Sequence, residues 1–322
     1  MKLCLGVTEL SEETLKFAAQ FGVTHLKLMG RDYLDEHYRG PLRPEKLATA
    51  QERAAAHGLR VGVVLLPQEP GSQFWNVRLG RPERERETDD VCRTLERLGE
   101  AGVPVVEYVF NLVGTWGYGH RPNTWGRGGA SITRFDHEPH KLAPPLPGQA
   151  VAAEAMWDRL AWFLERVVPV AEGAGVRLAC HPSDPPVRVL RGEERILCSI
   201  ADLERLIELV PSEANGINFC QGTIAEMGAD VVEAIHRFGS RGKIHHVHFR
   251  NVRGRVPCYD EVFIDEGDTD MLAAMSAFKQ VGYTGTIMPD HTPGVAGDSA
   301  WGHRGRAYAL GYIRALMHAV GR

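Results

Sequence analysis

The feature that most constrains the fold is a regular alternation of short apolar runs with longer amphipathic stretches along the 322 residues. Strands that alternate with helices form parallel sheets, because a helix must carry the chain back to the same end of the sheet. We find eight strand-like runs, at Leu3–Val7, Val23–Leu28, Leu59–Leu66, Val103–Phe110, Val176–His181, Gly216–Cys220, Lys243–Phe249 and Gly285–Asp290. Eight strand–helix units predict a closed α/β barrel, the (β/α)₈ or TIM barrel, rather than an open sheet.

Four of the intervening stretches carry clear helix signals. Pro44–His57 begins with a proline, which suits the first turn of a helix. Glu83–Gly102 opens with acidic residues, and Val151–Gly173 has apolar residues at spacings of three and four. Pro169 is expected to kink or end that third helix. The last helix is expected to start near Arg304.

Composition narrows the class of protein. With 43% hydrophobic and 24% charged residues the chain is predicted to fold. Its length permits two domains, but the eight units predict one barrel domain over residues 1–322. The net charge of -4 argues against nucleic-acid binding, and no apolar run approaches the roughly 20 residues of a membrane span. The start at Met1–Gly6 lacks a signal peptide's apolar core, so we expect a cytoplasmic protein.

Two connections are unusually long, and both follow the C-terminal end of a predicted strand. Residues 111–149 follow the fourth strand, and residues 251–269 follow the seventh. Active sites of TIM barrels lie at this end, so 111–149 is predicted to be an active-site loop insertion. The alternative is a surface insertion without function. Barrels of this type often form homo-oligomers, and the loop's aromatic residues offer a surface for that.

Metal-capable residues end the last four predicted strands. Side chains alternate along a strand, so if Val247 and Phe249 meet the helices, the neighbouring histidines point into the barrel. Four side chains are then predicted to converge at one rim: His181, Cys220, His248 and Asp290. Two imidazoles, a thiolate and a carboxylate suit a divalent transition ion with open positions for substrate. His246 lies one layer deeper and is expected to be structural.

Each of these residues alone is weak evidence, since a single strand histidine or cysteine is more often part of the core. The joint placement at corresponding strand ends favours metal binding. The other five cysteines are scattered, without a Cys-x-x-Cys pair, and are expected to be reduced and buried: Cys4, Cys92, Cys180, Cys198 and Cys258.

Two further residues near this rim are candidates for chemistry. His291 follows Asp290 beyond the eighth strand, and an imidazole titrates near neutral pH, so it is the candidate general acid or base. The alternative is a histidine that supports the metal ligands or lies on the surface. Arg250 lies on the inward face of the seventh strand and is a candidate clamp for a substrate carboxylate. Its alternative is an ion pair with Asp265 or Glu266.

The loops supply candidate substrate contacts. Asn111 continues the inward register of the fourth strand and is expected to bond a sugar hydroxyl. Trp116 and His120 belong to the long loop that is expected to cover the site, although such residues can also simply pack a loop. His303 and Arg304 start the last helix, where cations oppose the helix dipole, and this mildly favours a binding role over a structural one.

Five segments together resemble the mannonate dehydratase family, within the xylose-isomerase-like group of TIM barrels: His181–Pro186, Asn218–Thr223, His245–Val252, Phe263–Asp268 and Pro289–His291. The resemblance implies a hydro-lyase that converts D-mannonate to 2-keto-3-deoxy-D-gluconate with Mn²⁺, or with Fe²⁺ or Co²⁺. It implies metal ligands at the four residues already selected and an acid/base histidine at His291. The implied partner is a small sugar acid.

The family also has a catalytic tyrosine in a segment like Pro-Gly-Tyr-Ser-Ala. The nearest match here is Gly297–Ala300, and no tyrosine lies between Asp290 and Tyr308. The resemblance therefore leaves Tyr308 or Asp298 for that role. Two other functions stay open at this level: a metal-dependent sugar or inositol isomerase or epimerase, and a barrel that binds a sugar acid without turning it over.

Overall fold

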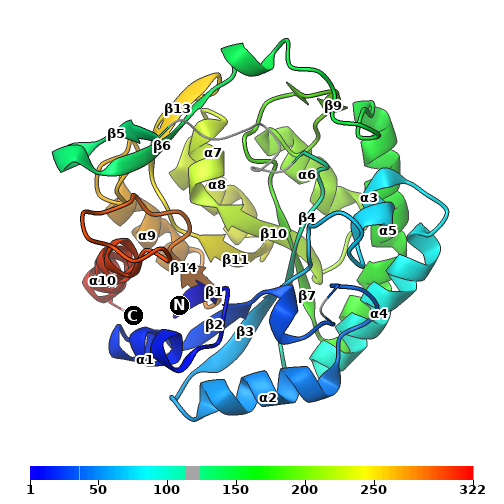
Figure 1. Cartoon of the computed structure of the whole chain (residues 1–322), viewed down its shortest axis with the longest axis horizontal. Coiled ribbons are helices and arrows are strands. Elements are labelled where there is room, and N and C mark those ends of the chain that lie inside the picture. The colour runs from blue at the N-terminus through cyan, green and yellow to red at the C-terminus, as the bar shows by residue number, and fades with distance from the viewer. Residues whose placement is uncertain (36, 114–122, 322) are drawn as a thin grey trace.

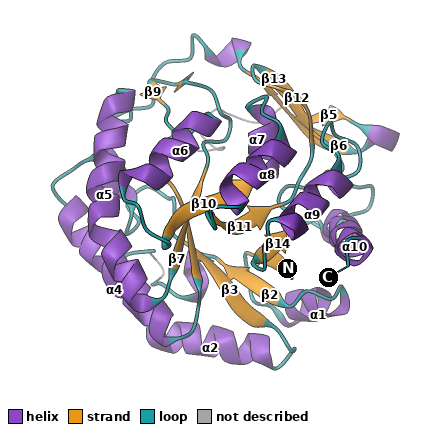
Figure 2. Cartoon of the chain, turned by 180° about the vertical axis from the view of Figure 1, so that it is seen from behind, coloured by secondary structure: helices purple, strands orange, loops and turns teal. Residues whose placement is uncertain are grey.

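Eight parallel strands form a closed barrel with helices around its outside (Figures 1 and 2). The computed structural model describes residues 1–35, 37–113 and 123–321. The barrel strands are β1 (Lys2–Val7), β2 (His25–Leu28), β3 (Arg60–Leu65), β4 (Val105–Val109), β7 (Arg177–His181), β10 (Asn215–Cys220), β11 (Ile244–His248) and β14 (Thr286–Met288). They pair in chain order, and β1 closes the ring against β14. The prediction of a TIM barrel is confirmed, strand by strand.

The helices are α1 (Glu12–Gln20), α2 (Pro44–Ala55), α3 (Trp75–Leu79), α4 (Arg84–Glu100), α5 (Ala153–Ala174), α6 (Ile200–Leu209), α7 (Gln221–Glu226), α8 (Val231–Gly239), α9 (Met271–Gln280) and α10 (His303–Ala319). The four helices expected from sequence are present. However, α5 does not end at Pro169, because Val168 and Ala171 on either side of it are buried against the core and hold the helix together. It ends instead at Gly175, which adopts the left-handed conformation of a helix C-cap.

The main apolar core lies between the barrel strands and the surrounding helices. Outward-facing strand residues such as Leu178 and Val247 are fully buried there. A smaller apolar cluster of Val63, Val105 and Ala179 lies apart from this core. All three residues belong to barrel strands.

The two long connections form a second sheet together. Its four antiparallel strands run in the order β12 (Val252–Arg255), β13 (Cys258–Glu261), β6 (Ser131–Asp136) and β5 (Asn123–Trp125). A two-stranded ribbon, β8 (Val189–Leu190) with β9 (Glu193–Glu194), follows β7. The expectation that these connections are plain loops is corrected. The sheet consists of two local hairpins, β5–β6 and β12–β13, and the pairing of β6 with β13 joins segments more than 100 residues apart, which no local pattern marks.

The cysteines differ in their exposure to solvent. Cys258 is exposed and Cys92 is partly exposed, so the expectation that these two are buried is corrected, whereas Cys4, Cys180 and Cys198 are buried. Among the residues that the structure describes, no helix is long and apolar enough to span a bilayer.

Candidate active site

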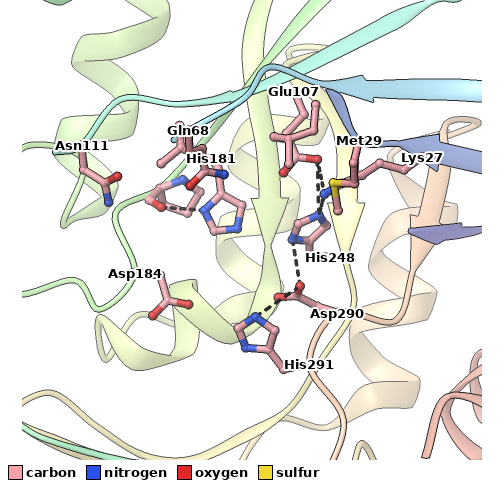
Figure 3. A pocket seen from close by; sticks show the side chains of 13 residues that line it. Lys27, Met29, Gln68, Glu107, Asn111, His181, Asp184, His248, Asp290 and His291 are labelled. Atoms are coloured by element: carbon pink, nitrogen blue, oxygen red, sulfur yellow. Dashed lines mark hydrogen bonds and ion pairs between the residues drawn. The ribbon is translucent and has the colours of Figure 1, made fainter. Parts of the chain in front are cut away.

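A pocket of about 210 Å³ opens at the C-terminal ends of the barrel strands (Figure 3). Its lining comes from both halves of the chain. Lys27 of β2 and Glu107 of β4 contribute from the first half. His181 of β7, His248 of β11 and Asp290 after β14 contribute from the second. This is the end of the barrel at which TIM-barrel enzymes place their chemistry.

The four predicted metal ligands come together beside this pocket. His181, Cys220, His248 and Asp290 each offer one ligand atom, and these atoms lie within 4.8 Å of one another. The convergence follows from the parallel barrel, in which neighbouring strands end at the same height. Cys220 is directly opposite His248 in the pairing of β10 with β11.

Hydrogen bonds set the orientation of one of these imidazoles. The Nδ1 of His181 lies 2.7 Å from the carbonyl oxygen of Pro182, which can only accept, so Nδ1 carries the proton. The other ring nitrogen, Nε2, is therefore the one that can serve as the metal ligand. A fixed tautomer of this kind is the usual preparation of a metal-binding histidine.

Charges around the thiol and the carboxyl favour their ionised forms. Burial on its own would raise the pKa of the Cys220 thiol, but Arg250 and His181 outweigh it and hold that pKa well below its usual value. Burial would likewise raise the pKa of Asp290, but His291 and His248 hold it well below its usual range. Thr223 also donates a hydrogen bond to the Cys220 sulfur, at 3.1 Å. Both groups are thus available as anionic ligands.

The fourth ligand, His248, bridges the pocket and the barrel interior. Its Nε2 faces inward, 3.1 Å from the Nζ of Lys27, 3.1 Å from the Nδ2 of Asn218 and 3.5 Å from the Oε2 of Glu107. Its Nδ1 faces Asp290 at 3.5 Å and, within the described chain, has no hydrogen-bond partner. The Nζ of Lys27 and the Nδ2 of Asn218 both donate to Nε2, so Nδ1 is the nitrogen that must give up its proton to bind a metal ion beside the Cys220 sulfur and the Asp290 carboxylate. His246 lies deeper, and its Nδ1 is 2.7 Å from the Thr286 hydroxyl.

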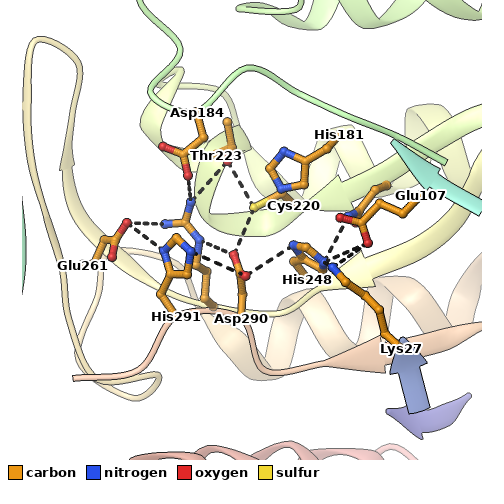
Figure 4. A network of polar contacts seen from close by, with 12 residues as sticks. Lys27, Glu107, His181, Asp184, Cys220, Thr223, His248, Glu261, Asp290 and His291 are labelled. Atoms are coloured by element: carbon orange, nitrogen blue, oxygen red, sulfur yellow. Dashed lines mark hydrogen bonds and ion pairs between the residues drawn. The ribbon is translucent and has the colours of Figure 1, made fainter. Parts of the chain in front are cut away.

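Arg250 does not occupy the position of a substrate clamp, because its guanidinium is paired with buried carboxylates, of which Asp184 and Asp290 are labelled in Figure 4. Its Nε bonds Asp290 at 2.9 Å, its Nη1 bonds Glu226 at 2.6 Å and its Nη2 bonds Asp184 at 2.8 Å. It is 3% exposed, and a buried guanidinium must be neutralised within the protein. The clamp expected from sequence is corrected to an internal hub that holds Asp290 in place.

The alternative pairing expected for Arg250 is corrected too. Asp265 pairs with Arg127, at 2.8 Å, and Glu266 pairs with Arg253, at 3.1 Å. These are partly exposed pairs outside the hub, so the sequence neighbours of the seventh strand are not the partners that the fold selects.

His291 lies at the rim of the pocket with one of its nitrogens already paired. Its Nδ1 is 3.0 Å from the Oε1 of Glu261 in β13, so the proton sits on Nδ1 and Nε2 is left for other partners. Desolvation would lower the pKa of His291, but Asp290 and Glu261 outweigh it and raise that pKa. The side chain is 40% exposed and therefore accessible to a substrate. This is an arrangement suited to proton transfer.

The remaining candidates for substrate binding do not all lie at the pocket. Asn111 lines the pocket as expected. Trp116 and His120 lie outside the described residues. His303 packs its ring against Trp301 and Phe17 on the outside of the barrel, away from the pocket.

Arg304 and the two candidates for the missing tyrosine also lie elsewhere. Arg304 donates to the Ala296 carbonyl. Asp298 accepts hydrogen bonds from the backbone N–H groups of Arg304 and Gly305, so it caps α10. Tyr308 is 43% exposed, packs on Phe263 and does not line the pocket. The roles expected for these residues are corrected: His303 and Arg304 at the substrate, Asp298 and Tyr308 in catalysis.

No role was assigned to Lys27, Glu107 or Glu261 from the sequence. Lys27 pairs with Glu107 at 2.6 Å inside the barrel. A lysine inside an apolar strand, as in His25–Leu28, is a usable signal, because a charged residue there must find a partner. Glu261 carried no such signal, since its place beside His291 depends on how the hairpin of β12 and β13 packs against the rim of the barrel.

We compared the chain with known protein families and structures. The model of the D-mannonate dehydratase family matches residues 148–322, which is more than half of the chain. A mannonate dehydratase of Thermotoga maritima is 30% identical over 316 residues, covering 86% of each chain. "Mannonate dehydratase 2" of Halalkalibacterium halodurans is 30% identical over 300 residues, covering 84% of each.

The chain belongs to the mannonate dehydratase family. Its enzyme class is accordingly that of the hydro-lyases. The crystal structure of the mannonate dehydratase from Streptococcus suis serotype 2 superposes with a TM-score of 0.87 at 25% identity, over 100% of this chain and 95% of that one. A D-tagatose 3-epimerase-like protein superposes at 0.65 with 16% identity, and this more distant likeness concerns the fold alone.

Proposed function

We propose that this mannonate dehydratase family member dehydrates D-mannonate to 2-keto-3-deoxy-D-gluconate, with a divalent ion, Mn²⁺ first among the candidates, held by His181, Cys220, His248 and Asp290. The observation that carries the proposal is the convergence of these four donors, within 4.8 Å, at a pocket lined by a rim histidine. The donor set leaves positions open for substrate oxygens.

The reaction removes the proton beside the carboxylate and the hydroxyl group on the next carbon, and releases them together as water. The enol that remains becomes the 2-keto product. When bound, a divalent ion supplies Lewis-acid stabilisation of the charge that develops next to the carboxylate. Everything else must come from side chains of the pocket.

His291 is the group that we assign to one of the two proton transfers. Its Nδ1 is held by Glu261, so Nε2 is the atom that takes up or delivers the proton. The raised pKa increases the protonated fraction of His291 near neutral pH, which suits protonation of the leaving hydroxyl. Arg250 holds the Asp290 carboxylate from below, and Asn111 faces the substrate across the pocket.

The test is an assay of α-keto acid formation from a panel of aldonic acids, with the purified protein loaded with Mn²⁺ or stripped by EDTA. Metal-dependent turnover of mannonate is the expected result. Cys220→Ala should abolish it, whereas Cys180→Ala, which removes a buried thiol facing away from the pocket, should not. Epimerisation of neutral sugars without loss of water would contradict the proposal. So would sugar-acid binding without turnover.

A further inference from the structure

Three buried charged side chains lie behind the pocket wall, and none of them takes part in the proposed reaction. Arg78 belongs to α3, Glu193 to β9, and Arg195 follows β9 directly. Each is at most 1% exposed. A buried charged side chain is tolerated only when it is paired and hydrogen-bonded. The partners of these three side chains therefore show which segments of the pocket wall they hold in place. We call Arg78, Glu193 and Arg195 the wall clamp.

Arg78 joins two segments of the pocket wall. Its Nη1 donates to the carbonyl oxygen of Asn111 at 2.8 Å, and its Nη2 donates to the carbonyl oxygen of Gln68, also at 2.8 Å. Both Asn111 and Gln68 line the pocket. The guanidinium also lies over the ring of Trp75, at 4.8 Å. Burial lowers the pKa of Arg78 to about 10, so the group is still cationic at neutral pH.

Glu193 holds the two peptides that follow. Its Oε1 accepts from the N–H of Leu112 and its Oε2 accepts from the N–H of Val113, each at 2.8 Å. Arg195 completes the cluster through the Val113 carbonyl, through Glu193 at 3.5 Å and through the Asp184 carbonyl at 3.2 Å. Buried charged groups therefore bind four backbone groups of residues 111–113: the Asn111 carbonyl, the Leu112 N–H, the Val113 N–H and the Val113 carbonyl.

The Asn111 side chain is the part of this wall that faces the pocket, across from His248 and Asp290 in Figure 3. The residue is 3% exposed, and its Oδ1 has no hydrogen-bond partner within the described chain. A buried acceptor without a partner is costly, and a ligand hydroxyl would remove that cost. The neighbouring backbone cannot move to relieve it, because the wall clamp holds it.

We propose that the wall clamp positions Asn111 so that its Oδ1 accepts a hydrogen bond from a hydroxyl group of the bound sugar acid. Arg78 and Glu193 are then positioning residues for substrate binding, and they act through Asn111 and not through the metal group. This inference rests on the proposed function for the identity of the substrate.

A double-mutant cycle on the Mn²⁺-loaded enzyme tests whether Glu193 acts through Asn111. Asn111→Ala should raise KM for mannonate about tenfold with little change in kcat, because it removes one neutral hydrogen bond. Glu193→Gln should raise KM by a similar factor, since an amide can accept from only one of the two backbone N–H groups. The double variant should resemble Asn111→Ala alone. Additive effects on KM would overturn the proposal.

Matched variants separate positioning from general damage. Glu194→Gln alters the adjacent acid, which accepts from the Ala153 N–H outside the pocket, and should leave KM unchanged. Arg78→Lys keeps the charge but cannot bridge the carbonyls of Gln68 and Asn111, so it should raise KM as Glu193→Gln does. It serves as the second variant if Glu193→Gln does not fold. An unchanged KM in a folded Arg78→Lys would also overturn the proposal.

A readout without substrate keeps this inference distinct from the proposed function. In Glu193→Gln the backbone amides of Leu112 and Val113 should exchange with deuterium at least tenfold faster than in the wild type, while Mn²⁺ affinity is unchanged. If the wild type does not turn over mannonate, the proposed function fails. If amide exchange at these two residues is unchanged, the wall clamp fails whatever the substrate.

Discussion

The last four barrel strands and the first four serve the pocket by different means. In the last four, the strand ends themselves deliver the four candidate metal ligands, and this is the part of the chain that the family model matches. In the first four, Lys27 and Glu107 form a buried pair inside the barrel, and the pocket wall after β4 is tied down by the wall clamp. Parallel strand ends align His181, Cys220 and His248, whereas Asp290 beyond β14 is held by Arg250 and the loop segment after β4 is held by the wall clamp.

The largest effect is expected from removing one of the metal ligands at the strand ends. Cys220→Ala should weaken Mn²⁺ binding by more than about 100-fold, because losing even the outer partners of metal ligands costs about 10- to 100-fold. Turnover of mannonate should disappear with it. Equilibrium dialysis against Mn²⁺ measures the first effect, and Cys180→Ala is the control. Unchanged Mn²⁺ affinity would remove Cys220 from the metal site.

The buried cations of the two halves should differ in their effect on stability. Arg250→Met leaves three buried carboxylates without their partner and should lower the free energy of unfolding by about 3–5 kcal/mol. Lys27→Met leaves only Glu107 uncompensated and should fall at the lower end of this range. Urea unfolding in EDTA measures both. A larger loss of unfolding free energy in Lys27→Met than in Arg250→Met would contradict this expectation.

The pairing of Glu261 with His291 links the second sheet to the chemistry. Glu261→Gln should lower kcat by about 100-fold, since it removes the charge that orients His291 and supports its protonated form. Mn²⁺ affinity should stay within about twofold, because Glu261 is not one of the four metal ligands. Glu266→Gln, which alters an acid paired with the exposed Arg253, is the control. Equal kcat values in the two variants would count against this role.

The smallest effect is expected from substituting His245, at the opposite end of β11. This histidine contacts a backbone carbonyl and no metal ligand. Burial lowers the pKa of His245 to about 4, below the value of about 6.5 in an unfolded chain. Folding therefore favours the neutral form. Its contribution to stability is complete above pH 6.5 and is lost as the pH falls towards 4, by about 2 kcal/mol at pH 5.

His245→Gln should consequently lose less stability than the wild type between pH 7 and pH 5, with turnover at pH 7 unaffected. Urea unfolding at the two pH values measures the difference. The exposed His236→Gln is the control and should follow the wild type. If His245→Gln follows the wild type as well, burial of this imidazole does not govern the acid response.

Much of the candidate site could be predicted because its signals are local. Each barrel strand is a short apolar run with its own turn signals, and a ligand such as His181 or Cys220 lies at a predictable place on it. The partners of Arg250 could not be predicted. Asp184, Glu226 and Asp290 come from three separate segments, and their proximity depends on how the loops above the barrel pack.

The barrel, the order of its strands and the four side chains that converge at its rim follow from the sequence alone, because a periodicity of two along parallel strands dictates which residues face inward at one height. The hub at Arg250, the bond between Glu261 and His291 and the wall clamp beside Asn111 became visible only once the chain was folded. These are contacts between segments far apart in the chain. They arise where buried charges must find partners, and no local pattern records which partner is nearest.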